Sequence, residues 1–183
     1  NSDDPLVLPL DLADAGAMPA AVAAVRQRFD RLDQVVHNGG ISQRSLVADT
    51  DLAVDRRIME VNFFGSVALT KAVLPWLKEQ GRGRFVVVTS LVGELPTPLR
   101  SAYSASKHAL HGFFESLRAE EYDSGIRVTL VMPGFIRTQV SFNALTADGS
   151  AQGSMDDAQE AGIAPDECAK RMVKAVQQGR DQV

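Results

Sequence analysis

Cysteine is almost absent from this chain of 183 residues, in which Cys168 is the only one. A single thiol can form no disulfide within the chain and supplies no cluster of thiolate ligands. The three histidines, His37, His108 and His111, show no pattern of carboxylates or cysteines at the spacing of metal ligands. We therefore expect neither a disulfide framework nor a metal site.

Excess positive charge and long apolar runs are also missing. The formal net charge is -4, which argues against nucleic acid or an anionic membrane as the main partner. No apolar stretch approaches the roughly 18 residues of a membrane span, and the opening letters NSDDP do not begin a signal peptide. We expect a cytoplasmic location, and a membrane anchor upstream of Asn1 stays open.

An alternation of strand and helix patterns runs along the chain. Apolar or β-branched runs predict strands at 6–12, 33–40, 84–90 and 126–134. Helical periodicity predicts helices at 16–32, 50–83, 101–125 and 164–179. The order β-α-β-α-β-α-β-α is typical of a single α/β layered domain with a parallel sheet.

Boundary signals mark the long 50–83 helix. Thr50 or Asp51 is a plausible N-cap, Gly81 is a plausible stop, and Pro75 is a candidate kink. Residues 139–163 have weak periodicity and three glycines, which indicates a mobile loop with at most a short helix.

Polar residues and glycines follow each predicted strand. Ligands of parallel α/β sheets bind at the carboxyl ends of the strands. These positions are Asp11, Asn38-Gly39-Gly40, Thr89-Ser90 and Pro133-Gly134. We expect them to line a single crevice.

Tyr103 and Lys107 stand four positions apart in the predicted 101–125 helix, so they share one helix face. A nearby ammonium favours the phenolate and lowers the pKa of a tyrosine toward the range of acid-base catalysis. An exposed tyrosine beside a solvated lysine explains the same spacing. Ser90, thirteen positions before Tyr103, supplies a hydroxyl for the same substrate oxygen. Asn62 is a polar amide among apolar residues, which is either functional or a satisfied helix kink.

In their order along the chain, these pieces resemble the short-chain dehydrogenase/reductase superfamily. The matching segments are LDLAD, HNGG, Asn62, VVVTSLVG, YSASK and PGFIRT, and they span residues 11–138. The stretches GGISQRSL and YSASKHALHGFFESLR look most like the branch of hydroxysteroid, retinoid and carbonyl reductases. The resemblance implies a doubly wound, Rossmann-like parallel sheet.

The resemblance also implies an NAD(P)-dependent enzyme that interconverts a carbonyl and an alcohol by hydride transfer. Tyr103 would exchange the proton with the substrate oxygen, and Ser90 would hold that oxygen. Lys107 would lower the pKa of Tyr103 and bind the nicotinamide ribose, and Asn62 would support a water in a proton relay. The alternative is a binding or regulatory module that keeps the dinucleotide fold without turnover.

The same resemblance assigns a set of residues to the cofactor, NAD or NADP. Asp11 and Leu12 would contact the adenine. Asn38, Gly39 and Gly40 would let the backbone approach the cofactor. The nicotinamide would be flanked by Pro133, Gly134, Ile136 and Thr138.

The chain departs from the family pattern in several ways. His37 and Gly39 stand where the family usually has Asn and Ala, and we interpret His37 as a core residue. No G-x-x-x-G-x-G turn precedes the first predicted strand, and no residue that separates NAD from NADP is present. A further strand begins at the letters RDQV. We infer a fragment that lacks the first β-α-β unit, with residues 6–12 and 34–38 separated by two missing strands.

The resemblance carries expectations about partners. A small carbonyl or alcohol is expected as substrate, and Phe135, Val140, Phe142 and Leu145 suggest an apolar lid. A homodimer or homotetramer is expected, because helices equivalent to 63–80 and 101–122 often form the subunit interface in this family.

Overall fold

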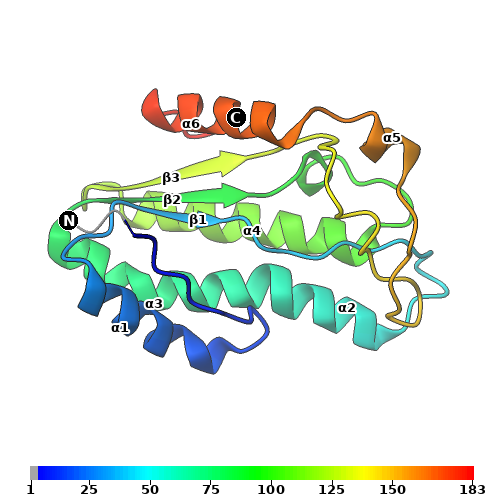
Figure 1. Cartoon of the computed structure of the whole chain (residues 1–183), viewed down its shortest axis with the longest axis horizontal. Coiled ribbons are helices and arrows are strands. Elements are labelled where there is room, and N and C mark those ends of the chain that lie inside the picture. Colours follow the sequence, from blue (N-terminus) through cyan, green and yellow to red (C-terminus); the bar gives the residue numbers. More distant parts are fainter. Residues whose placement is uncertain (1–3) are drawn as a thin grey trace.

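The computed structural model describes residues 4–183, and its centre is a sheet of three parallel strands. The strands are β1 (Gln34–His37), β2 (Gly83–Val88) and β3 (Ile126–Val131), and β2 lies between the other two. All three point in the same direction, so their carboxyl ends meet at one edge of the molecule (Figure 1). This is the α/β architecture with a parallel sheet that the sequence predicts.

Helices cover both faces of the sheet. On one side, α3 and α4 pack beneath the strands with α1 outside α3, while α6 lies on the opposite face (Figure 1). The α-helices are α1 (Met18–Arg28), α2 (Leu52–Met59), α3 (Gly65–Gln80), α4 (Ser101–Glu120), α5 (Asp157–Glu160) and α6 (Pro165–Gln177). Short 3-10 turns lie at Ala15–Ala17 and Leu91–Gly93.

The main core lies between the sheet and helices α3 and α4. Phe85 of β2 pairs with Val35 on one side and Val128 on the other, and it is fully buried together with Phe114 of α4. Burial of such aromatic and aliphatic side chains is the dominant stabilising contribution to a fold of this kind.

His37 is part of this core, as predicted. Its ring stacks on Phe85 with 5.9 Å between the ring centroids and lies 5.3 Å from Phe114. Its Nε2 is 3.0 Å from Thr70 Oγ1, so this buried ring nitrogen has a hydrogen-bond partner.

The predicted strand at 6–12 is wrong. This segment forms no strand, and its side chains are largely exposed. Among residues 4–183, its backbone forms a hydrogen bond to other backbone only in a turn, where Asp14 N donates to Asp11 O. A strand needs a neighbour for its N–H and C=O groups, and no strand of residues 4–183 lies beside this segment. It also makes no hydrogen bond to β1, as expected if two strands separate them.

The C-terminal residues form an isolated parallel bridge to β3 between Leu130 and Gln182, where the letters RDQV predict the beginning of a further strand. Leu130 N donates to Asp181 O at 2.9 Å, and Val183 N donates back to Leu130 O at 3.0 Å. The outer edge of β3 is therefore paired in parallel over these residues.

The predicted 50–83 helix is interrupted, but not at Pro75. A π-helical turn at Glu60–Phe64 separates α2 from α3, whereas Pro75 stays inside α3. Asp51 is the N-cap residue of α2, and Gly81 ends α3 in a left-handed conformation with φ of 66°. Such turns inside helices are frequent at functional sites, and this one carries Asn62.

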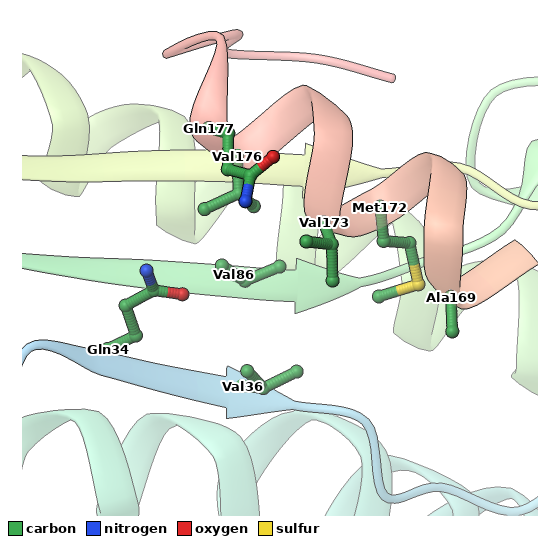
Figure 2. A pocket seen from close by; sticks show the side chains of 8 residues that line it. All are labelled: Gln34, Val36, Val86, Ala169, Met172, Val173, Val176 and Gln177. Carbon is green, nitrogen blue, oxygen red and sulfur yellow. The ribbon is translucent and has the colours of Figure 1, made fainter.

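A shallow apolar groove of about 280 Å³ lies between α6 and the sheet. Figure 2 shows Met172, Val173 and Val176 of α6 facing Val36 and Val86 of the strands. Helix α6 covers this face only in part, so Val36 and Val173 stay more than half exposed. Within residues 4–183, no helix has both the length and the apolar character needed to cross a membrane.

Candidate active site

Tyr103 and Lys107 lie on the same side of α4, within its first two turns. Lys107 Nζ is 5.6 Å from the centroid of the Tyr103 ring and donates a hydrogen bond to Val88 O at 2.9 Å. The small neighbours Ser104 and Ser106 are buried, which allows α4 to pack closely. The structure therefore anchors the lysine to the end of β2 and places its ammonium over the tyrosine ring.

The predicted effect of Lys107 on the pKa of Tyr103 is wrong in this structure. Burial raises the pKa of the Tyr103 phenol, and the groups that act against this rise are the Ser90 hydroxyl and the guanidiniums of Arg44 and Arg100. Burial also lowers the pKa of Lys107 to about 8. The lysine stands over the ring and bonds to a carbonyl, so it is not among the groups that stabilise the phenolate.

Ser90 lies two residues after the end of β2, and its hydroxyl is near enough to the Tyr103 phenol to act against the rise of its pKa. Two backbone bonds tie this end of β2 to the end of β3. In these bonds, Thr89 N donates to Val131 O at 2.8 Å and Leu91 N donates to Pro133 O at 3.1 Å. The predicted Thr89-Ser90 and Pro133-Gly134 segments are thus brought side by side.

Asn62 joins the segment after β1 to α4. Its Oδ1 accepts from Ile41 N at 2.8 Å, and its Nδ2 donates to Ile41 O at 2.9 Å and to Ser106 Oγ at 3.0 Å. Ser106 Oγ in turn donates to the carbonyl of Tyr103 at 2.7 Å. The amide is therefore fully satisfied, and it fixes the distance between this segment and the tyrosine.

The two glycines after β1 lie against other predicted site residues. An ideal Cβ at Gly40 would be 3.0 Å from Asn62 Oδ1 and 3.8 Å from Lys107 Nζ. One at Gly39 would be 2.6 Å from Leu12 Cδ1. A larger residue would displace Leu12 at position 39 or Asn62 at position 40, so the glycines let the backbone after β1 lie close to these side chains.

Other predicted residues surround this centre less closely. Asn38 and Asp11 are exposed, and the Asp11 carboxylate accepts a bond from Ala13 N in its own turn at 2.9 Å. Ile136 bridges to Ile163 across the loop after β3, and Thr138 is partly buried beside it.

The predicted apolar lid is divided. Phe135 and Phe142 are 48% and 42% exposed and remain available, whereas Leu145 packs in a small core with Val54, Ile58 and Ala102.

Gln43 was not predicted as part of the site, yet it holds the first turn of α4. Its side chain is fully buried; Oε1 accepts from Ala102 N at 2.9 Å, and Nε2 donates to Ser45 Oγ and Thr50 Oγ1, both at 3.1 Å. Gln43 therefore satisfies a helix N–H that lacks a partner within α4. The residue lies in the GGISQRSL stretch, but its partner is 59 residues away.

An ion cluster beside Tyr103 was also missed. Arg44 Nε donates to Asp156 Oδ2 at 2.8 Å, and Arg100 Nη2 donates to the same oxygen at 3.2 Å. These pairs span 112 and 56 residues, so no local pattern reveals them.

Comparisons with known proteins agree with this geometry. A family model described as short chain dehydrogenase matches residues 1–148. The dehydrogenase/reductase SDR family member 7B of Rattus norvegicus is 48% identical over 172 residues, which cover 94% of this chain and 53% of the rat protein. The chain thus belongs to the short-chain dehydrogenase family, and it spans about half the length of the curated relatives it matches.

Solved structures show the same fold. A short-chain dehydrogenase from Streptomyces avermitilis superposes with a TM-score of 0.79 at 27% identity, covering 96% of this chain and 69% of that one. A xylitol dehydrogenase with bound NAD+ superposes with a TM-score of 0.67 at 27% identity, covering 69% of this chain and 49% of that one. The Rossmann-like class that the sequence predicts is confirmed.

Proposed function

We propose that this chain carries the catalytic part of an NAD(P)-dependent oxidoreductase that interconverts a carbonyl and a primary or secondary alcohol. The observation that carries the proposal is the meeting of Ser90, Tyr103 and Lys107 at the carboxyl ends of β2 and β3. Residues 1–183 would form a single catalytic domain that is incomplete within this chain.

The residues present fit the nicotinamide half of a dinucleotide. Lys107 is buried and has three N–H donors, of which one bonds to Val88 O within the described residues. Its Nζ faces the position above Gly40, so ribose hydroxyls in that crevice would satisfy the remaining donors. Pro133 and Gly134 lie close to Ser90, because Leu91 N, the next residue's backbone donor, bonds to Pro133 O.

The proposed adenine contacts are Asp11 and Leu12, and Ile136 and Thr138 would flank the nicotinamide with Pro133 and Gly134. A glycine-rich phosphate turn is not part of this sequence, so the pyrophosphate contacts are not assigned to it. The choice between NAD and NADP follows from residues that the chain does not contain.

In this mechanism the nicotinamide supplies or accepts the hydride at the carbon of the substrate. Ser90 donates a hydrogen bond to the substrate oxygen. Tyr103 gives that oxygen its proton during reduction and takes it back during oxidation. Lys107 holds the ribose through its remaining N–H donors. Asn62 keeps the segment after β1 in register with α4.

The test is hydride transfer to a panel of ketones by the full-length gene product, followed by nicotinamide absorbance. Tyr103→Phe keeps the ring but removes the proton, so we expect a loss of kcat of at least about a hundredfold. Unchanged turnover in this variant would exclude Tyr103 as the acid-base group.

Tyr122 provides a matched control. It is the only other tyrosine and is 75% exposed on a turn after α4, so Tyr122→Phe should leave turnover within about twofold of wild type. Cofactor binding without turnover of any ketone by the wild-type protein would favour the non-catalytic binding module.

A further inference from the structure

Arg44, Arg100 and Asp156 form a compact charged cluster on three separate segments. Arg44 lies after β1, Arg100 is the N-cap residue of α4, and Asp156 is the N-cap residue of α5. Both arginines bond to Asp156 Oδ2. Their side chains are 8% and 17% exposed, and that of Asp156 is 22% exposed.

The cluster has more positive than negative charge. Two guanidiniums face one carboxylate, which leaves one positive charge uncompensated in a largely buried place. The two guanidiniums share one carboxylate oxygen and repel each other as like charges. Burial and the neighbouring charge of Arg44 accordingly lower the pKa of Arg100. A surplus buried charge is costly unless an opposite charge or further hydrogen bonds satisfy it.

This surplus charge adjoins Tyr103. Arg100 stands three residues before the tyrosine, at the start of the same helix. Arg44 directly follows Gln43, whose side chain accepts from the backbone N of Ala102 at 2.9 Å. On its outer side, Arg100 lies 6.0 Å from the ring centroid of the exposed Phe135 in the loop after β3.

The two arginines differ in the donors they have left. Arg44 uses all three of its nitrogens, on Asp156, Ser42 Oγ and the carbonyl of Gln43. Arg100 uses Nη1 on Thr97 Oγ1 and Nη2 on Asp156, and within the described residues its Nε makes no hydrogen bond. Arg100 is also the more exposed of the two, so it is the arginine able to take a ligand.

We propose that Arg100, supported by Arg44, binds an anionic group of the substrate, so that the preferred substrates are carbonyl compounds that carry a carboxylate or phosphate. The inference rests on the proposed function, because it names the substrate class of that same site. Asp156 holds the two guanidiniums together and competes with the substrate anion for Arg100. Guanidiniums bind such planar or tetrahedral oxyanions through paired N–H donors.

The experiment compares two pairs of ketones in the full-length gene product. The anionic probes are 3-acetylbenzoate and 4-acetylbenzoate, and each is matched by its neutral benzamide. The quantity measured is the ratio of kcat/KM for the acid to kcat/KM for the amide, which cancels any change in the chemical step. We expect a ratio well above one for wild type in at least one pair.

Two variants should move this ratio in opposite directions. Arg100→Met should lower it about tenfold or more, because a charged hydrogen bond is lost for the acid alone. Asp156→Asn should raise it, because the competing carboxylate is removed while the side chain keeps its size. Misfolding would lower activity toward both members of a pair, so it cannot produce opposite shifts of the ratio.

Arg171→Met is the matched control, since Arg171 is exposed on α6 and pairs with Glu167. It should leave the ratio unchanged. Equal kcat/KM values for acid and amide in wild type, or a ratio that Arg100→Met does not alter, would overturn the anion site while leaving the oxidoreductase proposal intact. Absence of turnover of every ketone would count instead against the proposed function.

Discussion

At the scale of single residues, burial decides the charge state of the groups around the site. The Tyr103 phenol is pushed toward its neutral form, and Lys107 has its pKa lowered to about 8. Ser90 and two arginines act against the rise at the tyrosine. The spacing of four residues predicts that tyrosine and lysine meet, but the sign of the pKa shift depends on how deeply they are buried.

His37 illustrates the same principle in the core. Its pKa is lowered to about 4 by burial, whereas the unfolded chain titrates near 6.5. Below pH 6.5 the unfolded state therefore binds a proton that the folded state refuses, and stability falls as the pH drops from 6.5 toward 4. We expect this residue to account for a loss of about 3 kcal/mol over that interval.

The measurement is the free energy of unfolding by urea at several pH values, in wild type and in His37→Gln. The variant removes the titrating group, so its stability should depend less steeply on pH between 6.5 and 4. His108→Gln is the control, because His108 is exposed on α4, and its slope should match wild type. Identical slopes for wild type and His37→Gln would contradict the prediction.

At the scale of elements, two buried amides connect loops to helices. Gln43 holds the first turn of α4 through Ala102 N, and Asn62 holds Ile41 from the π-helical turn before α3. Each replaces hydrogen bonds that irregular backbone cannot make within its own segment. The π-helical turn that interrupts the helix carries Asn62, and the same side chain bonds to Ile41 and Ser106.

Asn62→Leu tests this connection. The change keeps the number and branching of the side-chain heavy atoms but leaves the N–H and C=O of Ile41 without their partner, at about 1–3 kcal/mol for each group. We expect the free energy of unfolding to fall by about 2–4 kcal/mol, measured by urea denaturation of the full-length gene product. Asn143→Leu, on an exposed loop, should change it by less than about 0.5 kcal/mol. Equal effects of the two variants would show that the amide bonds contribute little.

At the scale of the whole molecule, apolar surface remains open beside α6 and near the start of α3, among other places. The groove beside α6 exposes Val36 and Val173, and Phe64 is 49% exposed near the start of α3. Helix α4 turns Ala105 and Gly112 to the outside, and a Cβ at Gly112 would meet no atom within 4 Å. Small residues at these two positions would allow a second helix to approach closely. The homodimer or homotetramer stays a prediction.

Gly112→Arg tests this interface. The open space around Gly112 means that the single chain can accept the larger residue, while a partner packed against α4 could not. We expect the full-length gene product to sediment as a dimer or tetramer. In the variant, the dissociation constant Kd of this oligomer should rise at least about tenfold.

Gln178→Arg adds the same charge at an exposed position after α6 and should not change the association. Sedimentation of the wild type as a monomer at high concentration would refute the predicted oligomer. An oligomer unaffected by Gly112→Arg would place the interface elsewhere.

Local chemistry in the sequence was enough to determine the order of most elements and the meeting of Tyr103 with Lys107. A helix repeats every 3.6 residues, so two side chains four positions apart share a face in any context. Buried parallel strands are likewise recognisable as β-branched runs, as in β2 and β3. The glycines after β1 were identified by their place at the end of a predicted strand. Their role toward the cofactor comes from the resemblance to the family and stays a prediction.

Tertiary structure alone decided the rest. The apolar segment at 6–12 has the composition of a strand, but a strand exists only where a neighbour takes its hydrogen bonds. Arg44, Arg100 and Asp156 meet across as many as 112 residues, and the surplus charge beside Tyr103 exists only after that meeting. Burial, too, is a property of the assembled core, so the direction of each pKa shift could not be deduced from spacing.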